Sequence, residues 1–281
     1  MTARNFEDYI IEAEHKLTTL DDYAKSPATA FLRYIVGAKD AANQCLLKFK
    51  ITARTRIYTR DALDSIHLIN AGLLAAIMGN FETYQKYLFA NMFEYSIYLK
   101  RFDTTRFLKA LKDSVKAEKS TKFEVDFSRI AGYRNSKVSV GLVLADQLSN
   151  WQSPSIVNSY FKSFGLEDEH GRKLEFYSNS DKDKLSVLWQ MRHSIVHTAS
   201  TITLPDSQKV SSLKRFGGKI ISLDTQFIYE VARKMRPIIK SATDNMHSVY
   251  VHNLFAGLPA NLETIINDVF KVSSTCNAWL R

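Results

Sequence analysis

The chain has 281 residues, with 38 Lys and Arg against 29 Asp and Glu, which leaves a formal charge of +9. With 45% hydrophobic and 12% aromatic residues, it is too apolar to be disordered throughout. Its 10 Gly and 5 Pro are too few for the many tight turns of a β-sandwich or β-barrel. Composition therefore predicts an all-α globular fold, and the length allows one large domain or two small ones.

Nothing in the sequence points to export or to a membrane. Residues 1–17 carry four acids and lack the basic start and unbroken apolar core of a signal peptide. The longest uncharged small and apolar run, Ala71 to Gly79, is far shorter than a membrane-spanning helix. The two cysteines, Cys45 and Cys276, form no CxxC motif, so no disulfide framework or cysteine-ligated zinc is expected. We expect a cytoplasmic protein with no membrane partner.

Helical spacing of apolar residues dominates the first half of the chain. It predicts amphipathic helices over about residues 6–20 and after Pro27, which together form an N-terminal helical elaboration of about residues 1–58. From about 60 to 100, apolar residues recur at three- and four-residue steps, so we expect one long helix, or two helices broken near Gly79-Asn80. Shorter helices are predicted over residues 104–115, 138–150 and 155–164.

A basic strip precedes the long helix. Between Asp40 and Asp61 the chain has no acid, while five bases accumulate: Lys48, Lys50, Arg54, Arg56 and Arg60. Such a run is typical of a solvated face or loop, and it is also typical of a strip that contacts the phosphates of a nucleic acid. We take RNA binding by these five residues as a hypothesis.

The most informative helix is predicted over about residues 181–197, with Ser180 or Asp181 as its cap. At about 100° per residue, Arg192 falls inside the apolar stripe of this helix, and His193 and His197 form a ridge beside the stripe. A guanidinium directed toward a core costs several kcal/mol unless a carboxylate or carbonyl groups receive it. Glu82 is the candidate partner, because its neighbours on the long helix are apolar and predicted to face the core.

The segment after this helix is predicted to be extended. We expect a β-hairpin or extended arm over about residues 201–223, with Gly217-Gly218 between two apolar-alternating runs. Asp224 is predicted to cap a long helix through about Val251, with a kink at Pro237, and a final helix starts near Asn261 in the C-terminal region of about 224–281. The arm is basic, and three of its residues are candidate RNA contacts: Lys214, Arg215 and Lys219.

The stretch Arg192-His-Ser-Ile-Val-His197 resembles the motif of the HEPN superfamily, in which an Arg and a His are separated by four to six residues. Many members of that superfamily are metal-independent ribonucleases. Glu82 looks like an acidic position often found in such domains, and the segment 216–224 is similar to the segment after the motif in several HEPN families. The resemblance covers about residues 82–236 and does not place the first 60 residues. With it we expect a single HEPN-like helical domain over residues 1–281, a homodimer with a composite site, and no cofactor.

The same resemblance implies a chemistry. In RNA the 2′-hydroxyl can attack the neighbouring phosphate if one group takes its proton, another protonates the leaving 5′-oxygen, and a cation stabilises the phosphate. His197 would be the acid or base, Arg192 the phosphate clamp, and His193 a polar assistant. The products would carry a 2′,3′-cyclic phosphate and a 5′-hydroxyl. Stand-alone HEPN ribonucleases resemble toxins or phage-defence effectors that cut tRNA or other RNA, which implies a separate antitoxin or regulator protein.

Each of these residues also has an alternative interpretation. His197 fits a helix-end histidine favoured by the helix dipole, Arg192 a structural ion-pair partner, and Glu82 a solvated carboxylate. His193 and His197 have the spacing of a metal pair, but the Glu of an HExxH motif is missing and no metal is expected. The alternative function is a catalytically inactive HEPN-type module that binds RNA or protein.

Overall fold

The computed structural model describes residues 18–116 and 139–274. These residues are mostly helical, with one two-stranded sheet, which confirms the predicted all-α class at this coarse level. The predicted helix over residues 6–20 falls almost wholly outside the described residues. The first half of the chain contains α1 (Leu20–Lys25), α2 (Pro27–Leu46), α3 (Arg60–Glu94), the short 3-10 helix η2 (Ser96–Tyr98), α4 (Thr104–Lys116), α6 (Val140–Gln147) and α7 (Pro154–Lys162).

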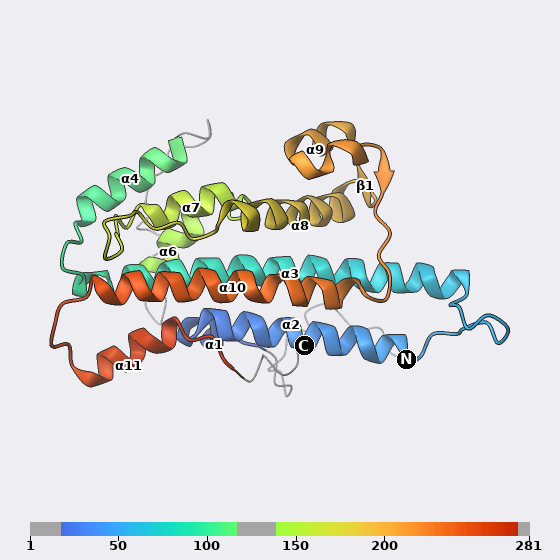
Figure 1. Cartoon of the computed structure of the whole chain (residues 1–281), viewed down its shortest axis with the longest axis horizontal. Coiled ribbons are helices and arrows are strands. Elements are labelled where there is room, and N and C mark those ends of the chain that lie inside the picture. The colour runs from blue at the N-terminus through green and yellow to red at the C-terminus, as the bar shows by residue number, and fades with distance from the viewer. Residues whose placement is uncertain (1–17, 117–138, 275–281) are drawn as a thin grey trace, which may run out of the picture.

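The second half contains the predicted motif helix, the arm and the C-terminal helices. Its elements are α8 (Asn179–His197), β1 (Thr201–Ile202), α9 (Leu204–Lys209), the 3-10 helix η3 (Ser211–Phe216), β2 (Lys219–Ile220), α10 (Phe227–His252) and α11 (Ala260–Val269). Figure 1 shows α8 above the long parallel rods of α3 and α10, with α2 below them.

Helix α3 is the centre of the bundle. It is a single helix from Arg60 to Glu94, capped by the Thr59 side chain, and it runs without interruption through Gly79-Asn80. Helices α2, α6, α8 and α10 all pack against it. By length and composition α3 is also the one described helix that could cross a membrane, but a central core helix passes the same test. Its place among four packed helices accounts for its apolar sequence.

One large core joins all the main helices. Its buried side chains run from Tyr23 in α1 to Phe270 after α11, and many are aromatic. The edges of Trp151 and Phe161 contact the Phe89 ring on α3. Buried tyrosine hydroxyls are satisfied, since Tyr250 donates a hydrogen bond of 2.9 Å to the carbonyl oxygen of Met92. The Tyr250–Met92 hydrogen bond joins α10 to α3, and α8 packs against α3 as well.

The motif helix forms close to the predicted position. It starts at Asn179, where the Ser178 hydroxyl accepts a hydrogen bond from the backbone N–H of Asp181, so Ser178 is the cap instead of Ser180 or Asp181. The helix ends at His197, as predicted. Leu185 and Trp189 are buried in this helix, and Trp189 is in ring contact with Phe81 of α3.

The arm differs from the predicted hairpin around Gly217-Gly218. Strand β2 pairs antiparallel with β1, with Thr201 opposite Ile220, and the chain between the two strands is helical. Helix α9 forms there because the Thr203 hydroxyl caps it and Pro205 occupies its first turn. The predicted β-hairpin is therefore wrong in its first strand, and the extended pairing involves the residues just after α8. A second small core underlies this arm, formed by Ala71, Ile202, Leu213, Ile221 and Leu223.

The C-terminal helices start close to the predicted positions. Helix α10 begins at Phe227, three residues after the predicted cap, because the Asp224 carboxylate accepts a hydrogen bond from the backbone N–H of Gln226 in a turn before the helix. Pro237 lies inside α10, and α11 begins at Ala260.

Candidate active site at the end of the motif helix

The last two turns of α8 present two histidines side by side. His193 and His197 are four residues apart and therefore share one face of the helix. Their ring centroids are 4.9 Å apart, and the rings are inclined at 46°. The His193 side chain is 43% exposed and His197 is exposed, so both imidazoles can be reached from solvent. The sequence predicted this ridge correctly.

A buried acid on α9 faces one of the two histidines. The Asp206 carboxylate accepts hydrogen bonds from Lys209 Nζ at 2.7 Å and from the Thr203 hydroxyl at 2.8 Å. Its Oδ2 atom lies 3.9 Å from His193 Nε2. The hydrogen bonds from Lys209 and Thr203 lower the pKa of Asp206 below its usual value. Asp206 therefore places a carboxylate group beside the ring of His193. No sequence motif singles out Asp206.

Arg192 is half-buried and has no ion-pair partner in the part of the chain that the structure describes. Its Nε atom is buried and likewise meets no hydrogen-bond acceptor there. Trp189, three residues earlier on a neighbouring part of the α8 surface, has a buried indole N–H that also finds no acceptor among the described residues. Buried donors normally find an acceptor, so this face of α8 has the capacity to hold water or an anion.

Glu82 does not receive Arg192. Its carboxylate lies 3.1 Å from Lys86 Nζ, and Lys86 lies 3.4 Å from Asp146 of α6. The neighbouring Phe81 does face α8, but the next residue is turned by about 100° around the helix and points toward α6. The expected Arg192–Glu82 ion pair is therefore not formed, and Glu82 belongs to a separate charge cluster between α3 and α6.

His67 on α3 is a residue of this region that sequence reasoning missed. Its Nδ1 atom accepts a hydrogen bond of 3.2 Å from the backbone N–H of Leu223, and its Nε2 atom lies 3.4 Å from the Ser200 hydroxyl. One turn further on, the side-chain amide of Asn70 donates to the carbonyl oxygen of Asp224 at 2.7 Å. His67 thus fastens both ends of the arm, 133 and 156 residues away in sequence. No local pattern could reveal such contacts.

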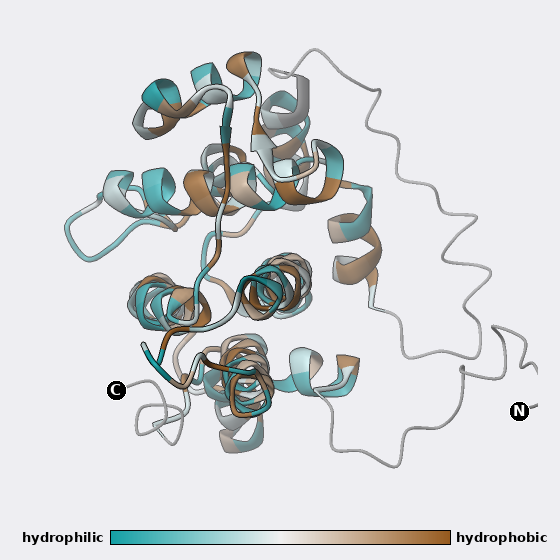
Figure 2. Cartoon of the chain, turned by 90° about the vertical axis from the view of Figure 1, so that its right-hand side faces the viewer, coloured by the Kyte–Doolittle hydropathy of each residue, from teal (hydrophilic) through white to brown (hydrophobic). Residues whose placement is uncertain are grey.

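Exposed bases lie at the same end of the molecule. Lys214 and Arg215 are on η3 and Lys219 is on β2, all exposed, and the guanidinium of Arg215 lies over the Phe216 ring. The other predicted strip occupies the loop between α2 and α3. The end of α8, the arm and this loop all lie in the right-hand half of the molecule in Figure 1, and the loop extends furthest to the right. Figure 2 looks onto this end, with the long helices seen nearly end-on.

An apolar groove is formed in part by the turns of α8 that precede the histidines. It has a volume of about 590 Å³ and lies between α8 and α10, where Leu188, Met191, Phe227 and Val231 are among the residues lining it. Lys184 and Lys234 are at its rim with Asp183 and Glu230. The groove is on the same helix as His193 but is formed mainly by the preceding turns.

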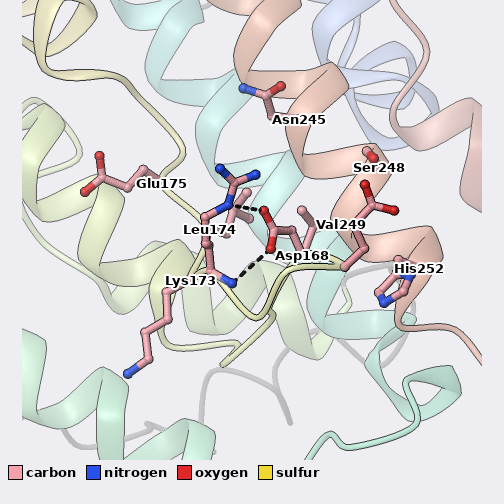
Figure 3. Close-up of a pocket in the computed structure, with 10 residues that line it drawn as sticks. Asp168, Lys173, Leu174, Glu175, Asn245, Ser248, Val249 and His252 are labelled. Atoms are coloured by element: carbon pink, nitrogen blue, oxygen red, sulfur yellow. Dashed lines mark hydrogen bonds and ion pairs between the residues drawn. The ribbon is translucent and has the colours of Figure 1, made fainter.

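A second, more polar pocket of about 500 Å³ lies at the opposite end of the bundle (Figure 3). The Asp168 carboxylate accepts hydrogen bonds from the backbone N–H and from Nε of Arg172, which lower its pKa. Glu175 is paired with Lys162 at 2.9 Å. Several charges of this pocket are thus already neutralised by neighbours, and its described lining includes His252 but no pair of histidines like that at the end of α8.

Among residues 18–116 and 139–274, no three His, Cys, Asp or Glu side chains are grouped so that they could hold a metal ion. No protein-family model, curated protein or solved structure matches this chain. The HEPN resemblance of the Arg192–His197 stretch therefore stays a prediction. The geometry at the end of α8 is the basis on which a function can be assigned.

Proposed function

We propose that the protein is a metal-independent endoribonuclease of HEPN type, which cleaves RNA at the end of α8 by attack of the RNA 2′-hydroxyl. The observation that carries the proposal is the exposed His193–His197 pair, with ring centroids 4.9 Å apart and with Asp206 beside only one of the two rings. General acid–base cleavage of RNA needs two proton-transfer groups near one phosphate. The pair supplies two such groups with different electrostatic surroundings.

In the proposed reaction one histidine accepts a proton and the other donates one. A neutral histidine takes the proton of the RNA 2′-hydroxyl while the 2′-oxygen attacks phosphorus. A protonated histidine gives a proton to the 5′-oxygen as its bond to phosphorus breaks. The products are a 2′,3′-cyclic phosphate and a 5′-hydroxyl end. We assign the role of proton donor to His193, whose Nε2 atom lies 3.9 Å from the Asp206 carboxylate. His197, exposed in the last turn of α8, fits the role of base.

Arg192 would supply the positive charge for the phosphate. Its guanidinium forms no ion pair in the described part of the chain, so its charge would be available to a phosphate. Adjacent residues leave a helix about 100° apart, so Arg192 and His193 point to neighbouring faces of α8. A second α8 across a two-fold axis would bring an Arg192 and a histidine pair to the same phosphate. The homodimer is therefore part of this proposal.

The RNA would run along the arm. Lys214, Arg215 and Lys219 are exposed on η3 and β2, and among the described residues none of them forms an ion pair with an acid. Lys and Arg that are not neutralised by the protein release counterions when they bind phosphates, which makes the affinity depend on salt. Phe216 is 36% exposed beside Arg215, and in this proposal its ring is where an RNA base would stack.

The test is cleavage of total RNA by purified protein in EDTA. Wild-type protein should cut the RNA, and His197→Ala and His193→Ala should each lower the rate at least a hundredfold. His170→Ala, an exposed histidine in the loop before α8, is the matched control and should cut like wild type. Intact RNA with the wild type would overturn the proposal, and RNA binding without cleavage would favour the inactive binding module instead.

A role as a toxin or phage-defence effector restrained by a separate protein belongs to the same proposal. Induced expression of the wild type should then arrest growth of a host cell, and the His197→Ala variant should not. Equal growth arrest by both proteins would show that any toxicity is unrelated to the α8 histidines.

A further inference from the structure

The loop between α2 and α3, residues 47–59, is an ordered projection. Its backbone closes on itself, because the N–H of Thr52 donates to the carbonyl oxygen of Ile57 at 2.7 Å and the N–H of Thr59 donates to that of Lys50 at 3.3 Å. An isolated antiparallel bridge joins Ile51 and Tyr58. Figure 1 shows this loop extending beyond the ends of α2 and α3. It therefore holds its side chains in fixed places away from the bundle.

The loop carries both basic side chains and exposed aliphatic side chains. Its bases are exposed and form no ion pair with any residue that the structure describes: Lys48, Lys50, Arg54 and Arg56. Three aliphatic side chains lie next to or among these bases in the sequence: Leu47, Ile51 and Ile57, which are 73%, 51% and 60% exposed. The apolar surface continues on the first turns of α3, where Leu63 and Leu68 are exposed. The nearest acids, Asp61 and Asp64, are on α3.

Phosphate contacts of RNA would explain the charge of this loop but not its aliphatic side chains. Large aliphatic groups held out into water from a fixed loop are unfavourable unless a partner covers them. Basic side chains together with exposed aliphatic side chains suit the surface of an anionic bilayer. There the basic side chains contact lipid headgroups, and the apolar side chains insert at the boundary between headgroups and acyl chains. A spanning helix is not required.

We propose that the loop of residues 47–59 docks the protein on an anionic lipid surface, with Leu47, Ile51 and Ile57 inserted between headgroups and the four loop bases against lipid phosphates. This departs from the expectation of no membrane partner. It does not rest on the proposed nuclease activity, because α8 and the arm contribute no residue to the loop.

The experiment is co-sedimentation of the full chain with vesicles of phosphatidylcholine alone and of phosphatidylcholine with about 30% phosphatidylglycerol. Wild-type protein should bind only the anionic vesicles. The double variant Ile51→Ser/Ile57→Ser should lower the affinity about a hundredfold, because each inserted aliphatic side chain contributes about tenfold. Lys48→Gln/Lys50→Gln/Arg54→Gln should lower it about a hundredfold, since each base near an anionic surface contributes about fivefold.

Two control variants change residues at the other end of the bundle. Ile97→Ser removes a 71% exposed aliphatic side chain from η2, and Lys173→Gln removes an exposed base, and both should bind like wild type.

Failure of the wild type to bind anionic vesicles would overturn the proposal. The proposal would also be overturned if the charge variant lost vesicle binding while Ile51→Ser/Ile57→Ser bound like wild type. The protein would then adsorb to the surface without insertion. If the charge variant instead loses RNA affinity in a gel shift while no vesicle binding exists, the loop is an RNA contact. Cleavage of RNA by each variant reports separately on the nuclease proposal.

Discussion

The imidazole rings of His193 and His197 lie one turn apart at the exposed end of α8, and only His193 faces an acid, Asp206, among the described residues. Two neighbouring imidazoles can take a proton from one oxygen of a phosphodiester and give a proton to another. The relationship arises from two separate parts of the chain, because α8 provides the histidines and α9 provides the acid. The arm is therefore a component of the candidate site as well as a surface for RNA.

The first prediction concerns the attachment of the arm by His67. His67→Phe leaves the backbone N–H of Leu223 without its acceptor, and we expect it to lower the free energy of unfolding by about 1–3 kcal/mol. Hydrogen exchange of the Leu223 amide should accelerate more than exchange in α10. Unchanged exchange at this amide would contradict the assigned contact. His170→Ala, at an exposed site, is the stability control.

The second prediction is a pH dependence of stability. Hydrogen bonds from Lys209 and Thr203 hold the pKa of Asp206 below its ordinary value of 3.8. A carboxyl group with a lower pKa in the folded state adds stability above the unfolded-state pKa, and this contribution is lost as the pH falls through the folded value. Urea unfolding should therefore show Asp206→Asn less stable than wild type at about pH 7, and the difference should shrink below about pH 4. A difference that stays constant down to about pH 2 would disagree with the lowered pKa.

The third prediction uses two glycines with opposite surroundings. A Cβ atom on Gly141 of α6 would clash with the carbonyl oxygen of Ala90, so Gly141→Ala should force α6 away from α3 and destabilise by about 1–3 kcal/mol. Gly72 is exposed in the first half of α3 with open space around it, and Gly72→Ala should stabilise by up to about 1 kcal/mol. Thermal melts of both variants check the pair. A Gly141→Ala protein as stable as wild type would mean that α6 lies further from α3.

The fourth prediction separates Glu82 from the candidate site. Glu82 is paired with Lys86 and points toward α6, so Glu82→Gln should leave the kcat/KM for RNA cleavage within about twofold of wild type. Arg192→Gln should lower it by about a hundredfold or more, because it removes the cation proposed to face the phosphate. Equal losses in the two variants would reinstate Glu82 as an Arg192 partner.

The sequence predicted helices well where periodicity is long. The α8 prediction was within two residues, and α2 begins at Pro27 as expected. The arm was misjudged because six-residue segments carry little periodicity, although Thr203 with Pro205 and Asp206 close behind it is a helix-start signal. The predicted direction of the Glu82 side chain was wrong. Neighbouring residues of a helix point about 100° apart, so the residue next to a core-facing position can face α6 instead. The contacts of His67 and Asp206 depend on the tertiary structure.

The most direct test of the central claim compares two oligonucleotides of one sequence, unmodified RNA and fully 2′-O-methylated RNA, both incubated with wild-type protein in EDTA. Cleavage through the α8 histidines requires a free 2′-hydroxyl as the attacking nucleophile. We predict that only the unmodified RNA is cut, that its fragments end in 2′,3′-cyclic phosphate, and that His197→Ala abolishes the reaction. Cleavage of the methylated RNA, or fragments with 3′-hydroxyl ends, would contradict the assignment of α8 as the catalytic helix.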